Sequence, residues 1–98
     1  MTKAIFLDRD GVINIEKNYL YKIEDFEFVP GTFDSLRHLQ NLGYKLFIIT
    51  NQSGIGRGYY SLDDFNKLTS WMIEELRKES IVISQVELCP HSPDQDCT

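Results

Sequence analysis

Two carboxylates, Asp8 and Asp10, lie one residue apart directly after an apolar run near the start of the chain. The run from Ala4 to Leu7 is typical of a buried strand, and Gly11 after the two acids indicates a turn. Carboxylates this close repel one another unless a cation lies between them. The pattern predicts a divalent metal and chemistry on an anion, with a solvated turn as the alternative.

The two acids favour phosphoryl transfer. Asp8 can attack phosphorus as a nucleophile and form an acyl phosphate, which divides one difficult displacement into two easier steps. Asp10 is then placed to protonate the leaving oxygen and later to take a proton from the hydrolysing water. Mg²⁺ bound to these acids would offset the charge of the phosphate. A calcium loop of EF-hand type is excluded, because its glycine belongs at the sixth position and Gly11 is at the fourth.

Three short apolar segments, at residues 3–7, 45–50 and 85–88, are predicted strands. A helix opening at Pro30 and closing at Gly43 separates the first two, and a longer helix after Ser61 separates the last two. The intervening segments 11–28 and 51–60 are predicted loops. This order predicts an α/β fold with a parallel sheet and right-handed crossovers, in which ligands bind at the carboxyl ends of the strands.

Polar residues follow each predicted strand, so they should meet at one edge of the sheet. Thr50 and Asn51 follow the second strand, and their hydroxyl and amide N–H groups can donate to phosphate oxygens. An ordinary turn is the alternative for this pair. The next segment has glycines at 54, 56 and 58, a spacing that does not match a dinucleotide loop and favours a pocket border. Arg57 within it either binds substrate phosphate or is a solvated surface residue.

Cys89, His91 and Cys97 have the composition and close spacing of zinc ligands. A structural zinc site takes four protein ligands, and three are visible here. A disulfide between Cys89 and Cys97, or two unligated thiols, are the alternatives that stay open.

Size and charge narrow the function classes. The 98 residues correspond to one small domain, with a net charge of −5 and a pI near 4.8. This charge argues against a nucleic-acid or anionic-membrane surface. No apolar run approaches ~20 residues and no signal-peptide pattern is present, so no membrane span and a cytoplasmic location are expected.

The motifs resemble a known family. Residues 8–13 (D-R-D-G-V-I) together with residues 49–52 (I-T-N-Q) resemble the haloacid dehalogenase superfamily of phosphohydrolases. Residues 51–58 (N-Q-S-G-I-G-R-G), with C-P-H at 89–91 and Cys97, resemble its D-glycero-D-manno-heptose 1,7-bisphosphate 7-phosphatase branch. The resemblance covers the whole chain.

The resemblance implies a Rossmann-like, three-layer α/β/α fold and assigns roles to residues. Asp8 would be the nucleophile, Asp10 the general acid/base whose main-chain carbonyl also binds Mg²⁺, and Thr50 the residue that holds the phosphoryl group. Substrate contacts would come from Glu16, Lys17, Asn18, Tyr19, Asn51, Gln52 and Ser53. The reaction would be hydrolysis of the 7-phosphate of the heptose bisphosphate, in the synthesis of nucleotide-activated heptose for lipopolysaccharide and other surface polysaccharides.

The chain departs from the family pattern after its third predicted strand. The phosphate-binding lysine and the later acidic motif have no counterpart, and the fourth zinc ligand would lie beyond Thr98. Residues 1–98 therefore read as one incomplete phosphatase domain, truncated after the third strand, with a zinc loop at 89–98. We expect the chain alone to have little or no activity. The open edge at the first strand should favour self-association, whereas a full-length protein is expected to be a monomer.

Two rival functions remain at this point. Histidinol-phosphate phosphatase, a sister branch, has the same paired acids and a short zinc loop, but Ser53 and Arg57 favour the heptose branch. The rival from another class is an inactive metal- or phosphate-binding fragment that needs a partner chain.

Overall fold

The computed structural model describes residues 3–89. Its elements are, in order, β1 (Lys3–Asp8), η1 (Ile23–Asp25), α1 (Thr32–Asn41), β2 (Tyr44–Asn51), α2 (Ser53–Gly56), α3 (Leu62–Lys78) and β3 (Ile83–Cys89). The predicted alternation of three strands and two longer helices is confirmed. The prediction of continuous loops at 11–28 and 51–60 is wrong where η1 and α2 form, because helices of three or four residues are too short to show a hydrophobic period.

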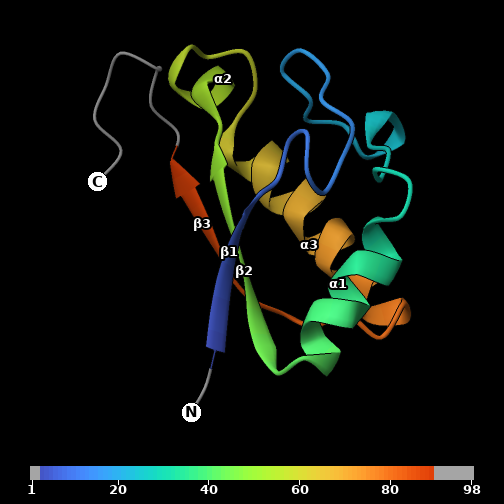
Figure 1. The fold of residues 1–98 in the computed structure, drawn as a ribbon. Helices are drawn as coiled ribbons and strands as arrows, with labels where there is room; N and C mark the ends of the chain where they lie inside the picture. Colours follow the sequence, from blue (N-terminus) through green and yellow to red (C-terminus); the bar gives the residue numbers. More distant parts are fainter. Residues whose placement is uncertain (1–2, 90–98) are drawn as a thin grey trace.

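The three strands are parallel and lie in the order β1-β2-β3. The chain steps across the sheet in one direction, and right-handed crossovers then place both longer helices on the same face. Figure 1 shows α1 and α3 together on one side of the strands. The α/β parallel-sheet prediction is confirmed, and the described residues supply two of the three expected layers.

Local sequence signals set the helix bounds. The Ser61 side chain accepts a hydrogen bond from the Asp64 N–H while the Asp64 carboxylate accepts one from the Ser61 N–H, which forms a capping box at the start of α3. At the end of α1, Gly43 has a φ of 94°, a left-handed conformation that glycine adopts without strain. The helices therefore begin and end close to the predicted residues.

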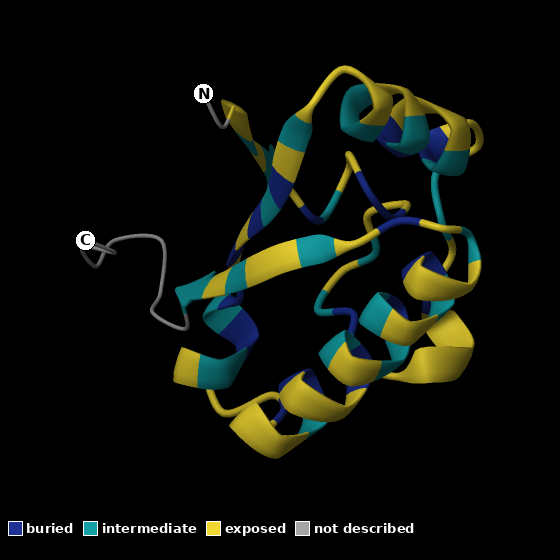
Figure 2. Ribbon diagram, turned by 90° about the horizontal axis from the view of Figure 1, so that it is seen from below, coloured by how far each residue is buried: buried dark blue, intermediate teal, exposed yellow. Residues whose placement is uncertain are grey.

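The core lies between the sheet and the two helices. Leu46 and Ile48 of β2 are completely buried, as are Met72 and Leu76 of α3. Figure 2 shows the buried surfaces of the helices turned toward the strands and the exposed ones turned outward. This layer holds the strand ends in fixed relative positions.

The opposite face of the sheet carries exposed apolar side chains. Phe6 is 59% exposed and Ile49 43%, and the Phe6 ring stacks on that of Phe47 with centroids 5.1 Å apart. Within the sheet formed by residues 3–89, β1 is an edge strand, which confirms the predicted open edge. No helix in this part of the chain is long and apolar enough to cross a membrane.

Candidate active site

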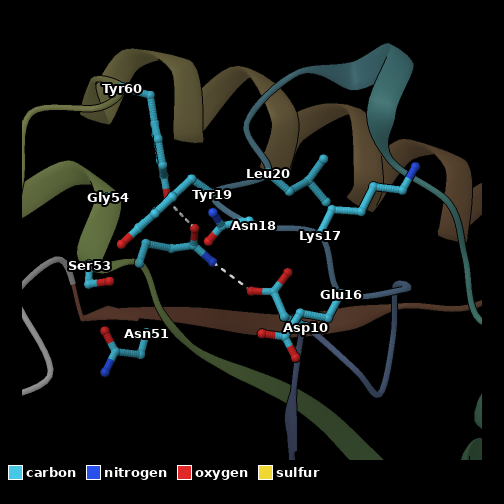
Figure 3. Close-up of a pocket in the computed structure, with 11 residues that line it drawn as sticks. Asp10, Glu16, Lys17, Asn18, Tyr19, Leu20, Asn51, Ser53, Gly54 and Tyr60 are labelled. Carbon is cyan, nitrogen blue, oxygen red and sulfur yellow. Dashed lines mark hydrogen bonds between the residues drawn. The ribbon is translucent and has the colours of Figure 1, made fainter.

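A pocket opens at the carboxyl ends of β1 and β2, where α2 begins. Its cavity of about 200 Å³ is smaller than the ~300–1,000 Å³ of a typical ligand pocket. Figure 3 shows the lining residues, which are Asp10, Glu16, Lys17, Asn18, Tyr19, Leu20, Asn51, Gln52, Ser53, Gly54 and Tyr60.

The loop after β1 curls back on itself and places Asp10 at the pocket. The N–H groups of Val12, Ile13 and Asn14 all donate to the Arg9 carbonyl, at 3.2, 2.8 and 3.1 Å. Gly11 permits this tight turn with a φ of 89°. The turn returns Asn14 to the side of Asp10, where its Nδ2 donates to Asp10 Oδ1 at 2.9 Å.

Three side chains hold the Asp10 carboxylate. Besides Asn14, the Arg9 Nη2 donates to Oδ1 at 2.8 Å and the Gln52 Nε2 donates to Oδ2 at 3.0 Å. Arg9 is only 1% exposed, and its Nε and Nη1 have no partner within the described part of the chain. The buried guanidinium therefore depends on Asp10 for its counter-charge, and the pair fixes the orientation of the carboxylate.

Gln52 connects Asp10 to the end of β2. Its side chain is nearly buried, and its Nε2 also donates to Thr50 Oγ1 at 2.7 Å. The Tyr60 hydroxyl donates to the Gln52 Oε1. Burial raises the pKa of Tyr60 to about 12, so this hydroxyl keeps its proton throughout the neutral range. The main-chain N–H of Gln52 donates to the Cys89 carbonyl at 2.7 Å, which ties the site to β3.

The other wall of the pocket is more open. Glu16, Asn18 and Asn51 are exposed. Lys17 is turned toward the segment around η1, where its Nζ donates to the Asp25 carbonyl at 2.6 Å and to Glu27 Oε1 at 2.8 Å. These contacts anchor the 16–20 segment beside the pocket.

Several predicted site residues lie apart from this pocket. Asp8 is the last residue of β1 and is exposed, but it is not among the lining residues. Arg57 follows α2, is exposed and does not line the pocket either. Cys89 ends β3, while His91 and Cys97 lie outside the described residues, so the zinc site stays a prediction.

Sequence reasoning missed three residues of the site: Arg9, Asn14 and Tyr60. An arginine placed between two acids was a usable signal, because neighbouring carboxylates are ready partners for its positive charge. Asn14 and Tyr60 gave no such signal. A turn of the chain brings Asn14 back to Asp10, and another brings Tyr60 back to Gln52.

The oxygen atoms near the strand ends are of a kind that can bind a magnesium ion. With the Asp10 carboxylate engaged by three N–H donors, the Asp8 carboxylate and the Asp10 main-chain carbonyl are the oxygens left for a metal. Mg²⁺ prefers such hard oxygens, and it commonly takes one or two carboxylates while keeping several waters. Within residues 3–89, no group of three or more His, Cys, Asp or Glu side chains could hold a metal ion. The Asp8 carboxylate and the Asp10 carbonyl are oxygens of the kind that magnesium prefers, and the site that they would form together stays a prediction.

Comparisons with known proteins identify the family and the fold of the chain. The family model described as polynucleotide kinase 3 phosphatase matches residues 3–87. A crystal structure of D,D-heptose 1,7-bisphosphate phosphatase from B. bronchiseptica, complexed with magnesium and phosphate, superposes with a TM-score of 0.87 and 31% identity. That match covers 98% of this chain and 54% of the other. The fold is thus that of a haloacid dehalogenase-like phosphatase.

The chain belongs to the phosphatase family described as polynucleotide kinase 3 phosphatase. It is 55% identical over 96 residues to D-glycero-alpha-D-manno-heptose-1,7-bisphosphate 7-phosphatase of Campylobacter jejuni. It is 53% identical over 96 residues to the corresponding beta-heptose enzyme of Helicobacter pylori. These matches cover 98% and 97% of this chain, and the chain spans 56% of the length of each relative. They confirm the family resemblance and do not favour the histidinol-phosphate alternative.

Proposed function

We propose that this chain carries the nucleophile, the general acid/base and most of the substrate pocket of a D-glycero-D-manno-heptose 1,7-bisphosphate 7-phosphatase. The observation that carries the proposal is the similarity to two such enzymes over nearly the whole chain. The hydrogen-bonded arrangement of Asp10, Gln52 and Thr50 supports it, because these groups meet at the edge of the sheet where ligands of such folds bind.

The reaction proceeds through two displacements at phosphorus. A carboxylate oxygen of Asp8 attacks phosphorus while the bond from phosphorus to the sugar oxygen breaks, and Asp10 gives its proton to that oxygen. Water then attacks the phosphorus of the Asp8 acyl phosphate, and Asp10 takes a proton from that water. Inorganic phosphate leaves, and both carboxyl groups return to their starting states.

The remaining strand-end groups stabilise the charge that moves during these steps. The Thr50 hydroxyl accepts from Gln52, so its own hydrogen is available to a phosphoryl oxygen, and Asn51 supplies amide donors beside it. Mg²⁺, when bound by the Asp8 carboxylate and the Asp10 carbonyl, supplies positive charge next to the phosphate.

The open wall of the pocket would bind the sugar. Glu16, Lys17, Asn18, Tyr19 and Ser53 line it, and their mixture of donors and acceptors suits the hydroxyl groups of a heptose. The side-chain hydrogen bonds of Gln52 go to protein groups, so this residue contributes to the pocket by shaping it. Arg57 is the least supported of the predicted contacts, because it does not line the pocket.

Several finer predictions accompany the proposal. Zinc held by Cys89, His91 and Cys97 would be structural, since thiolates and imidazole are its usual ligands and the chemistry belongs to the strand ends. The single-domain boundary at 1–98, the cytoplasmic location and the role in surface polysaccharide synthesis stay predictions as well.

The proposal is tested with two forms of the protein. One is the chain itself, and the other is an extended chain, in which the part of the C. jejuni relative beyond its matched residues follows residue 98. Phosphate release is measured with Mg²⁺ and both anomers of heptose 1,7-bisphosphate, with histidinol phosphate as the competing substrate. We expect turnover of the heptose substrate by the extended chain and little or none by the chain alone.

Asp8→Asn should lower the turnover of the extended chain by more than about a thousandfold, because the amide is a poor nucleophile. Acid-quenched samples of the unsubstituted extended chain should carry phosphate on Asp8 by mass spectrometry. A folded extended chain that hydrolyses neither substrate, or an Asp8→Asn variant that keeps its rate, would overturn the proposed function.

A further inference from the structure

The segment between α2 and α3 sends one side chain back into the active site. Tyr60 is buried, and its hydroxyl reaches the Gln52 amide, whose nitrogen bridges Asp10 and Thr50. The dashed lines in Figure 3 follow this chain from Tyr60 to the neighbouring amide and on to Asp10. Tyr60 is thus linked to Asp10 and Thr50, the residues with proposed catalytic roles, through the single side chain of Gln52.

The surrounding residues hold the Tyr60 ring in this position. It stacks on Tyr21, with centroids 5.3 Å apart and an interplanar angle of 8°. On its other side it passes so close to Gly54 that a Cβ there would lie 2.2 Å from Tyr60 Cε1. The ring can reach Gln52 because residue 54 has no side chain.

The direction of each hydrogen bond follows from the chemistry of the partners. In the structure Asp10 Oδ2 accepts from the Gln52 nitrogen, so Gln52 turns its NH₂ group toward Asp10 and its Oε1 toward Tyr60. The buried Oε1 then needs a donor, and the Tyr60 hydroxyl is the donor that it has. If the amide turned over, its oxygen would face the carboxylate and the lone pairs of Thr50.

We propose that Tyr60 is a positioning residue that locks the orientation of the Gln52 amide, so that one NH₂ group aligns Asp10 and Thr50 for the same phosphoryl group. The inference rests on the proposed function for its kinetic consequence. Its structural part, the locked amide, does not depend on turnover.

The first test observes the amide directly. The side-chain NH₂ signals of Gln52 are assigned by NMR in the isotope-labelled full chain and compared with those of two single variants. Tyr60→Phe removes the hydroxyl but keeps the ring, and we expect the Gln52 signals to shift and broaden. Tyr59→Phe removes the neighbouring exposed hydroxyl, which makes no hydrogen bond in the described structure, and should leave these signals unchanged.

The second test measures turnover in the extended chain. Tyr60→Phe should lower kcat roughly tenfold, about the effect of one misaligned hydrogen bond, with KM within about twofold. Gln52→Met removes the amide altogether, and in this background Tyr60→Phe should have no further effect on kcat. Tyr59→Phe again serves as the control.

The outcomes separate this inference from the proposed function. Unchanged Gln52 signals in Tyr60→Phe would overturn the locked amide, whatever the turnover. Independent, multiplying effects of Tyr60→Phe and Gln52→Met on kcat would overturn the alignment role. If the extended chain shows no turnover, the proposed function fails and the alignment role fails with it, while the NMR comparison still decides the locked amide.

Discussion

The two walls of the pocket differ in what holds their side chains. The inner wall is formed by Asp10 and Gln52, which are joined to one another by a hydrogen bond and, through Gln52, to the buried Thr50 next to the pocket. The outer wall, formed by residues 16–19 with Asn51 and Ser53, is mostly exposed, and Lys17 makes its side-chain hydrogen bonds away from the pocket, around η1. One wall is aligned by the fold, and the other has polar groups left for a ligand.

This difference separates two kinds of kinetic effect. A group aligned by several protein contacts is positioned before the substrate arrives, so disturbing it should lower kcat. A group that meets the substrate only in the complex contributes mainly to binding, so removing it should raise KM. Substitutions on each wall test whether this division holds.

Asp10→Asn should have the largest effect on the inner wall. The amide cannot give or take the proton, and we expect kcat of the extended chain to fall by about 10²–10⁴. Arg9 also loses its counter-charge, so the free energy of unfolding measured in urea should decrease. Asp63→Asn, an exposed acid on α3, is the matched control and should change neither quantity. A kcat within tenfold of the unsubstituted protein would contradict the role of Asp10.

Gly54→Ala should disturb the inner wall indirectly, by displacing the ring of Tyr60. The added methyl would lie 2.2 Å from Tyr60 Cε1 and 3.0 Å from Tyr19 Cδ1, so both rings must move. We expect a loss of about 1–3 kcal/mol in the free energy of unfolding, as for other overpacked sites. The kcat should fall at least as far as in Tyr60→Phe, because the displaced hydroxyl no longer reaches Gln52. Unchanged stability and kcat would show that the ring is not held where the structure has it.

Lys17→Met should have the smallest effect, and on the outer wall. The side chain loses a partly exposed ion pair with Glu27, worth less than about 1 kcal/mol of stability. Because the 16–20 segment then loses an anchor beside the pocket, we expect KM for the heptose bisphosphate to rise about threefold with kcat unchanged. Lys67→Met, which removes a similar exposed pair with Asp63 on α3, is the control. A fall in kcat without a change in KM would place Lys17 with the inner wall.

The order of elements and the edge of the sheet at which the polar residues gather were predictable because their signals are local. Apolar runs that end in acids or in Thr-Asn mark buried strands and their polar ends, and parallel strands bring such ends to one edge. Ser61 and Gly43 marked helix ends through chemistry confined to a few neighbouring residues. The roles of Asp8, Asp10 and Thr50 came from the family resemblance rather than from these signals.

The sequence by itself determined the parallel α/β architecture, the edge of the sheet that carries the candidate site and the acids found there, since each depends on short-range patterns and on the handedness of crossovers. Only the tertiary structure decided that Arg9 is buried against Asp10, that Gln52 joins Asp10 to Thr50, and that Tyr60 reaches Gln52 across Gly54. These contacts join residues up to 42 positions apart or depend on how a turn closes, and such pairings leave no period or spacing in the chain.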